Sequence, residues 1–315
     1  LGDVYKRQDY TTAVNEFQQV IDQNSRLAES YRAEGIAYYS EKAYPEAIAA
    51  FSRSLNNMDD PDKEFKKDVQ FYLAQARMDY GEVDKAIEVY SEILKAGEDE
   101  QAFFLRGKAY ISMEDYKNAE KDFQRALEGC EDYNLYINIY QIYVDHNKAV
   151  DGDAYLKMAL ELEPQDGEDC YHRGRIYEYE KNYEAARDEL KTAMEQGYED
   201  AMLLLGRVYL EMEDPASARS MYQEYLQKSE QGAKAYNGLA MCDIYDGAYD
   251  SALENIAQGL KENSKEDEQG LLYNEIVAYE YKRDFATAKE KMKIYLEQYP
   301  EDEAALRENE FLSTR

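Results

Sequence analysis

Apolar and polar residues follow one another along this chain with the period of an α-helix. In residues 28–39, tyrosines and a glycine recur three or four residues apart, so they share one helical face. This first face consists of Tyr31, Gly35 and Tyr38. A second face follows a short polar turn at residues 40–43, and it consists of Tyr44, Ala47, Phe51 and Ser54. The pattern therefore predicts two helices joined by a turn, a helical hairpin.

The hairpin pattern returns about every 34 residues. In the second helix of each copy, an alanine is followed four residues later by a large apolar residue. The alanines are Ala13, Ala47, Ala86, Ala119, Ala186, Ala218, Ala252 and Ala288, and Gly152 takes the place of alanine in a degenerate copy. The spacings are 34, 39, 33, 33, 34, 32, 34 and 36 residues. Such a period over so many copies predicts a solenoid of stacked helical hairpins.

One position of the first helix is glycine in four of the repeats. When Ala28 is counted as position 1 of its repeat, position 8 holds Gly35, Gly107, Gly174 and Gly206. Glycine inside a helix costs roughly 1 kcal/mol relative to alanine. We therefore expect position 8 to lie where the two helices of a hairpin approach closely. The degenerate copy has Tyr140 at position 8 and Gly152 at position 20, so we expect its packing to be looser or slightly rotated.

These positions resemble the tetratricopeptide repeat (TPR) over about residues 9–300. The resemblance rests on Gly or Ala at position 8, Tyr at 11, Ala at 20, an aromatic residue at 24 and sometimes Pro at 32. The tryptophan usual at position 4 of the family is absent, and its place is taken by Tyr31, Phe103, Tyr136 and Tyr236. The resemblance implies an all-α, right-handed α-α superhelix with about eight full repeats, a truncated first repeat and a C-terminal capping helix.

The predicted organisation has three parts. Residues 1–27 form the truncated first repeat, residues 28–300 form repeats 2–9, and residues 301–315 form the capping helix. Residues 1–8 fit the repeat poorly and resemble read-through of a cloning adapter. We therefore expect the chain to be a fragment whose native N-terminus is missing.

The inner surface of TPR proteins is lined mainly by the first helix of each repeat, at positions 2, 5, 9, 12 and 13. Positions 5 and 12 of this chain are largely apolar, which is typical of a binding surface. The predicted peptide-binding groove consists of Tyr39, Phe71, Phe104, Lys108, Ile111, Tyr171, Arg175, Leu203, Arg207, Ile244 and Tyr273. The alternative is that these apolar side chains only pack on adjacent helices.

Position 9 adds positive charge to this surface at Lys108, Arg175 and Arg207. These side chains would hold an acidic group of a bound peptide, because arginine offers two parallel hydrogen bonds to a carboxylate. The alternative is that they pair within the chain, with Glu168, Glu178, Glu211 or Asp145. Some TPR domains bind chaperone tails with Lys at position 5 and Asn at position 9. Neither residue occurs there in this chain, which argues against that role.

Composition narrows the function further. The net charge of −30 argues against binding to nucleic acid or to anionic membranes, and it favours either a solvated outer face or attraction of basic partners. The 32 tyrosines are interpreted mainly as core residues. Cys130, Cys170 and Cys242 lie in three non-adjacent repeats, too far apart for a disulfide, and form no metal-binding cluster. No nucleotide-binding or metalloprotease motif occurs.

The sequence therefore predicts a scaffold that binds a protein or peptide segment, with no catalytic residues, no cofactor and no metal. The alternatives are a protein that self-associates into homo-oligomers, or the TPR part of a larger bacterial surface lipoprotein. The compartment stays open between the cytoplasm and the cell surface, because a signal or anchor would lie in the missing N-terminal part.

Overall fold

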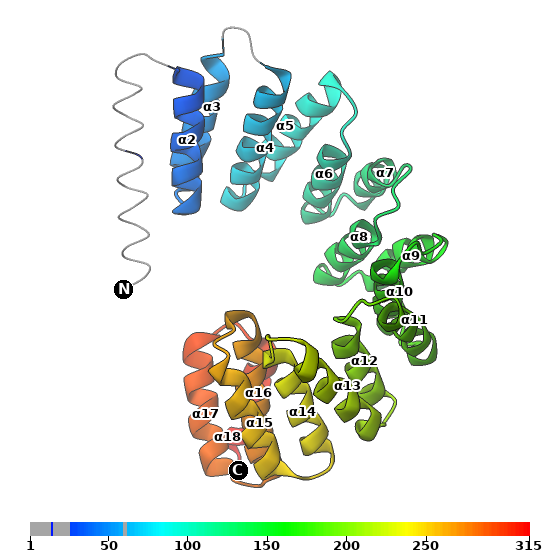
Figure 1. Cartoon of the computed structure of the whole chain (residues 1–315). Helices are drawn as coiled ribbons and strands as arrows, with labels where there is room; N and C mark the ends of the chain where they lie inside the picture. Colours follow the sequence, from blue (N-terminus) through cyan, green and yellow to red (C-terminus); the bar gives the residue numbers. More distant parts are fainter. Residues whose placement is uncertain (1–13, 15–25, 59–61) are drawn as a thin grey trace. The chain divides into compact units, whose positions relative to one another are not determined.

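The computed structural model describes residue 14, residues 26–58 and residues 62–315, and its secondary structure there is entirely α-helical (Figure 1). The predicted truncated first repeat falls almost wholly outside the described residues. The helices are α2 (Leu27–Ser40), α3 (Tyr44–Asn56), α4 (Lys63–Tyr80), α5 (Val83–Ala96), α6 (Glu100–Ser112), α7 (Tyr116–Ala126), α8 (Tyr133–Asp145), α9 (Ala149–Leu160), α10 (Gly167–Tyr179), α11 (Tyr183–Glu195), α12 (Ala201–Glu211), α13 (Pro215–Lys228), α14 (Ala233–Tyr245), α15 (Tyr249–Lys261), α16 (Lys265–Tyr281), α17 (Phe285–Gln298) and α18 (Glu303–Ser313).

Successive helices pack in pairs, and within a unit the contacts continue between pairs, as from α3 to α4, α5 to α6, α11 to α12, α13 to α14 and α15 to α16. The pairs α2 with α3, α6 with α7, α10 with α11 and α14 with α15 make the most extensive contacts. The last helix, α18, packs on α17. The chain divides into two compact units, and the division falls in the sequence of α9, between Lys157 and Met158. The predicted all-α array of helical hairpins is confirmed.

Repeat positions 20 and 24 of the second helix lie in the core of every hairpin. The alanines at position 20 from Ala47 to Ala288 have no exposed surface. The large residues at position 24 are also buried, and they are Phe51, Tyr90, Phe123, Leu156, Leu190, Tyr222, Ile256 and Met292. Burial of a large apolar side chain contributes roughly 1.5–3 kcal/mol to stability. Burial at positions 20 and 24 therefore explains why the same kinds of residue recur there.

The turn between the two helices of each hairpin has one repeated geometry. Its central residue has a positive φ, as at Lys42 (59°) and Gly81 (89°). The next backbone N–H reaches back to the carbonyl five residues earlier, as from Ala43 to Tyr38 at 2.9 Å. This is the Schellman arrangement, which satisfies carbonyls that the end of a helix leaves free. The eight turns of the described hairpins use it, and each one returns the chain toward the preceding helix.

The glycines at position 8 lie against the large residues at position 24. A Cβ on Gly35 would lie 2.5 Å from the ring of Phe51, and one on Gly107 would lie 2.7 Å from the ring of Phe123. No side chain fits in that space. The expected close approach of the two helices at position 8 is therefore present, and it seats the large residue of the second helix.

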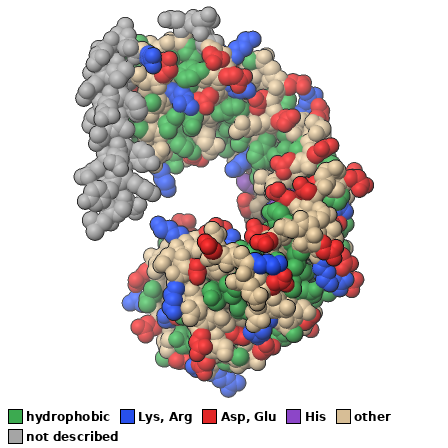
Figure 2. Space-filling view, in the orientation of Figure 1, with side chains coloured by type: hydrophobic (Ala, Val, Ile, Leu, Met, Phe, Trp, Pro, Cys, Tyr) green, Lys and Arg blue, Asp and Glu red, His purple; other side chains and the backbone are tan. Residues whose placement is uncertain are grey.

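Acidic side chains lie across the visible face of both units (Figure 2). Cys170 and Cys242 are buried and Cys130 is partly exposed, and all three thiols are free. Among the described helices, none is both long enough and apolar enough to cross a membrane.

Candidate functional site

The predicted groove residues of the first unit are only partly available to a ligand. Tyr39, Phe71 and Phe104 are half-buried, and each ring contacts a neighbouring aromatic ring with centroids 5.8–6.3 Å apart. Lys108 is exposed, and no ion pair joins it to another described residue. Ile111 is fully buried, so the binding surface that we propose does not include it.

The predicted groove residues of the second unit converge more closely. Tyr171, Leu203 and Arg207 line a single pocket of about 780 Å³. Ile244 and Tyr273 are half-buried and pack against core residues of α14–α18 instead. The pocket therefore brings together three of the six groove residues predicted for this unit.

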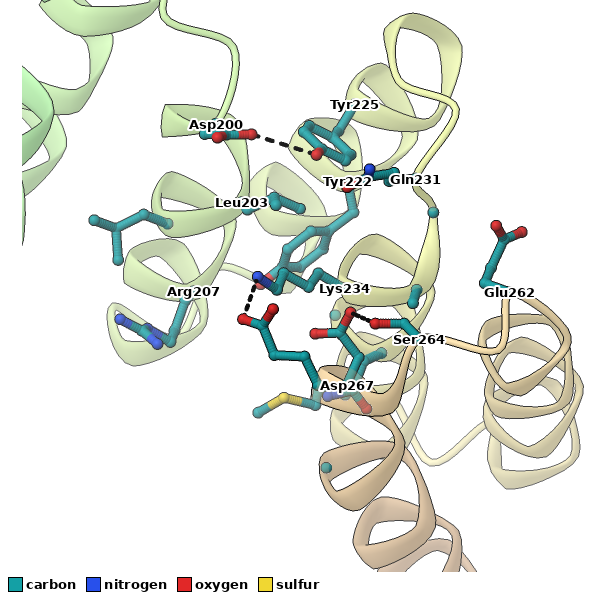
Figure 3. Close-up of a pocket in the computed structure, with 18 of the residues that line it drawn as sticks. Asp200, Leu203, Arg207, Tyr222, Tyr225, Gln231, Lys234, Glu262, Ser264 and Asp267 are labelled. Carbon is teal, nitrogen blue, oxygen red and sulfur yellow. Dashed lines mark hydrogen bonds and ion pairs between the residues drawn. The ribbon is translucent and has the colours of Figure 1, made fainter. Parts of the chain in front are cut away.

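Five helices contribute to this pocket (Figure 3). Helix α10 supplies Tyr171, and α12 supplies Leu203 and Arg207. Helices α13, α14 and α16, with the segments that join them, supply the remaining walls. These residues include Tyr222, Tyr225, Lys234, Asn237, Gly238, Met241, Glu262, Ser264, Glu266, Asp267 and Gly270. The first helices of four successive repeats, α10, α12, α14 and α16, thus form one concave surface.

Tyr222 belongs to the second helix of its hairpin and still lines the pocket. Its ring lies between α12 and α14, where both helices carry glycine. A Cβ on Gly206 would lie 2.6 Å from Cζ of Tyr222, and a Cβ on Gly238 would lie 2.3 Å from the same atom. The side chain is only 4% exposed, and burial raises the pKa of the phenol. The two glycines therefore let the end of this ring reach the pocket (Figure 3).

The two cations that line the pocket are both held by carboxylates of the chain. Nε and Nη2 of Arg207 lie 2.5 and 2.6 Å from the two carboxylate oxygens of Glu178. Nζ of Lys234 lies 3.1 Å from Oε1 of Glu266. The intramolecular alternative for Arg207 is thus present in the structure, with Glu178 as the partner.

Arg175, the other basic residue predicted for this unit, lies outside the pocket lining. Its Nη1 lies 3.2 Å from Nδ1 of His172, and its guanidinium lies 5.9 Å from the ring centroid of Tyr171. His172 is buried, and its Nε2 lies 3.7 Å from Glu168. Arg175 is thus part of a small polar cluster beside Tyr171.

Tyr222 and Lys234 line the pocket but are not among the residues of the predicted groove. Tyr222 was assigned to the core because of its position 24, and repeat periodicity does not reveal how far a ring extends between two helices. Lys234 occupies position 2, one of the inner-face positions, so a signal for it was present. No group of three or more His, Cys, Asp or Glu residues in the described part is arranged to hold a metal ion.

Comparison with known proteins gives a consistent result for the fold. A family model for the tetratricopeptide repeat matches residues 3–62, 171–233 and 203–268, and a second such model matches residues 100–132. Together these matches cover more than half of the chain. No curated protein matches the sequence.

Two solved structures show the same arrangement of helices. A tetratricopeptide repeat protein from Parabacteroides merdae is 12% identical, and the match covers 80% of this chain and 100% of that one with a TM-score of 0.51. Yeast Tom70 is 15% identical, and the match covers 92% of this chain and 75% of that one with a TM-score of 0.53. At these identities the likeness concerns the fold alone.

Proposed function

The chain belongs to the tetratricopeptide repeat family, and from this premise we propose that it binds a segment of another protein in the pocket of its second unit. Tetratricopeptide repeats generally mediate protein–protein interaction. The role that we propose is binding without catalysis, as is typical of such scaffolds.

The observation that carries this proposal is the convergence of Tyr171, Leu203 and Arg207 on one pocket. These residues come from position 5 of two repeats and position 9 of one. The volume of about 780 Å³ lies within the range of about 300–1,000 Å³ typical of ligand pockets. Met241, which is 40% exposed, adds apolar surface to the lining. A concave surface that combines some apolar surface with many polar and charged groups suits several residues of an extended or helical segment.

The sequence-based expectation of an acidic group on the ligand meets an obstacle at Arg207. Its guanidinium already forms two short contacts with Glu178, so an acidic ligand would have to displace that carboxylate. Arg175 contacts His172 and Tyr171, and it lies outside the pocket lining. A ligand with an acidic group is therefore the alternative outcome of the experiment.

The experiment is selection of random twelve-residue peptides, displayed on phage, against the full chain. Selected peptides are then synthesised with a fluorophore, and their affinity is measured by anisotropy. The variant Met241→Trp fills the pocket from an exposed position, and we expect it to weaken binding about tenfold or more. Met113→Trp is the matched control, because Met113 is 45% exposed and belongs to the first unit. Failure to select any peptide, or equal binding to both variants, would show that the pocket is not the binding site.

A further inference from the structure

Resting on this proposed function, we infer that the segment bound in the pocket inserts a lysine or arginine side chain among Asp200, Glu266 and Asp267. The inference concerns the chemistry of the partner, and it is carried by the distribution of charge in the pocket and by the hydroxyl group of Tyr222, which reaches the pocket.

The carboxylates of the pocket outnumber its cations. Four acidic residues line it, and they are Asp200, Glu262, Glu266 and Asp267, against Arg207 and Lys234. The charge of Arg207 is also neutralised by its ion pair with Glu178. The pocket therefore carries excess negative charge at neutral pH, and a cationic group would be attracted to it.

Three of these carboxylates act on the same ammonium group. The hydrogen bond from Lys234 to Glu266 raises the pKa of Lys234, and the charges of Asp267, Glu266 and Asp200 raise it further. Within residues 62–315, neither Asp200 nor Asp267 forms an ion pair. Asp200 accepts a hydrogen bond from the Tyr225 hydroxyl at 3.3 Å, and Asp267 accepts one from the Ser264 hydroxyl at 2.6 Å. A second cation from a ligand would balance this group of carboxylates.

Tyr222 gives an independent indication that the pocket receives a polar ligand. Its side chain is more than nine-tenths buried, and its ring is directed between Gly206 and Gly238 into the pocket (Figure 3). Its hydroxyl group has no hydrogen-bond partner among the described residues, and it is open to the pocket, since it is not one of the buried atoms that lack a partner. An N–H or carbonyl group of a bound segment would supply that partner.

The shape of the lining suits a long basic side chain. Leu203 is half-buried and Met241 is 40% exposed, so both offer apolar surface to the pocket. The methylene stem of lysine or arginine packs on such surface while its charged end stays among polar groups. A basic ligand would thus use the apolar wall and the carboxylates together, and it would leave the Arg207–Glu178 pair in place.

The first test uses the peptides selected from the phage library. We expect them to be enriched in lysine and arginine over aspartate and glutamate. Replacement of the enriched basic residue by glutamine should lower the affinity about tenfold. The affinity should also fall when NaCl is raised from about 0.05 to about 0.5 M, because salt screens exposed charges. Enrichment of acidic residues, or equal binding of the glutamine peptide, would overturn the inference.

The second test changes the pocket. The double variant Asp200→Asn, Asp267→Asn keeps the shape of both side chains and removes their charge, and it should weaken the basic peptide about tenfold while leaving the glutamine peptide unchanged. The matched control is Glu254→Gln, Glu290→Gln, which neutralises two exposed carboxylates on α15 and α17 and should leave both peptides unaffected. Tyr222→Phe should weaken binding several-fold at an unchanged melting temperature.

The two proposals fail in different ways. If Met241→Trp abolishes binding but the peptides show no preference for basic residues, the pocket binds protein segments and the inference about charge is wrong. If the peptides are basic but bind Met241→Trp normally, they bind elsewhere, and both proposals are wrong. If the double variant binds the basic peptide as tightly as the wild type does, Asp200 and Asp267 do not recognise it.

Discussion

The hairpins α12–α13 and α8–α9 accommodate a buried tyrosine between two helices in opposite ways. In α12–α13, the first helix carries Gly206 and the second carries Tyr222. In α8–α9, the first helix carries Tyr140 and the second carries Gly152, where a Cβ would lie 3.0 Å from Cδ2 of Tyr140. Both tyrosines are buried, at 4% and 8% exposure. In these two hairpins one large residue meets one glycine at the contact, and either helix can supply the glycine.

The exchange of tyrosine and glycine between the two helices changes which side chains reach the inner surface. Because α12 carries the glycine, the ring of Tyr222 extends past it into the pocket. In the α8–α9 hairpin the large side chain belongs to the first helix, α8, and more than half of the residues of α8 are buried. These buried residues are Tyr133, Tyr136, Ile137, Ile139, Tyr140, Ile142 and Tyr143. The regular hairpin thus opens the inner surface to a side chain of its second helix, and the exchanged hairpin does not.

The largest expected effect comes from removing the buried ring in either hairpin. Tyr222→Ala and Tyr140→Ala should each lower the free energy of unfolding by about 3–5 kcal/mol, because each leaves a cavity between helices. Tyr245→Ala is the control, since Tyr245 is 55% exposed and should change stability by less than about 0.5 kcal/mol. Urea unfolding followed by far-UV circular dichroism measures all three. A cost for Tyr222→Ala no greater than that of the control would contradict the role of this ring.

The next effect comes from adding one methyl group at a glycine contact. Gly238→Ala should destabilise the chain by about 1–3 kcal/mol, because the new Cβ would lie 2.3 Å from Cζ of Tyr222. Gly270→Ala is the matched control on α16, where the nearest atom is the amide nitrogen of Asn237 at 3.4 Å. There alanine should stabilise the helix by up to about 1 kcal/mol. The two substitutions are chemically identical, so equal effects in urea unfolding would exclude the steric explanation.

Gly152→Ala is the corresponding substitution in the α8–α9 hairpin, where the glycine lies on the second helix. Its Cβ would lie 3.0 Å from Cδ2 of Tyr140 and from Cβ of Tyr143, a milder overlap than at Gly238. We expect a cost of about 1 kcal/mol, smaller than that of Gly238→Ala. If Gly152 and Tyr140 compensate each other, Gly152→Ala should cost less in a Tyr140→Leu background. A double-mutant cycle measures this coupling. Strict additivity of the two free-energy changes would show that Gly152 and Tyr140 do not compensate each other.

The repeat and its core were predictable because periodicity identifies the face on which a residue lies. Position 20 alanines and position 24 residues are buried as that reasoning requires. The packing of α8 on α9 was not predictable in the same way. Tyr140 and Gly152 together predicted packing that is looser or slightly rotated, whereas in the structure the ring of Tyr140 lies directly against Gly152.

The candidate site was predictable only in part, because periodicity identifies the face on which a residue lies and not its fit with neighbouring residues. Inner-face positions led to Tyr171, Leu203 and Arg207, which do meet in one pocket. The contribution of Tyr222 depends on two glycines in different repeats, Gly206 and Gly238, and no single repeat contains that information. The depth that a side chain reaches is a property of neighbouring repeats together.

At α8–α9, neighbouring residues compensate each other in size. At repeat position 12, a carboxylate is compensated in charge by its neighbour in one repeat and not in another. Position 12 holds Glu178 on α10 and Glu280 on α16. Glu178 meets the guanidinium of Arg207 from the next repeat. Glu280 instead faces Glu308 of α18, and one of its carboxylate oxygens is buried without a hydrogen-bond partner. Burial, followed by the charge and hydrogen bond of Glu308, raises the pKa of Glu280 to about 7.

This raised pKa gives the smallest predicted effect, a dependence of stability on pH. The folded state holds the proton of Glu280 more tightly than the unfolded state, where the pKa is 4.5. The resulting stabilisation is therefore fully present below about pH 4.5 and is lost as pH rises through about 7. We expect a loss of about 1 kcal/mol between pH 5 and pH 8, since solvent screens this partly exposed group. Glu280→Gln should remove that part of the pH dependence, whereas Glu290→Gln, an exposed carboxylate on α17, should not. Urea unfolding at both pH values measures it, and an identical pH profile for Glu280→Gln and wild type would show that Glu280 and Glu308 share no proton.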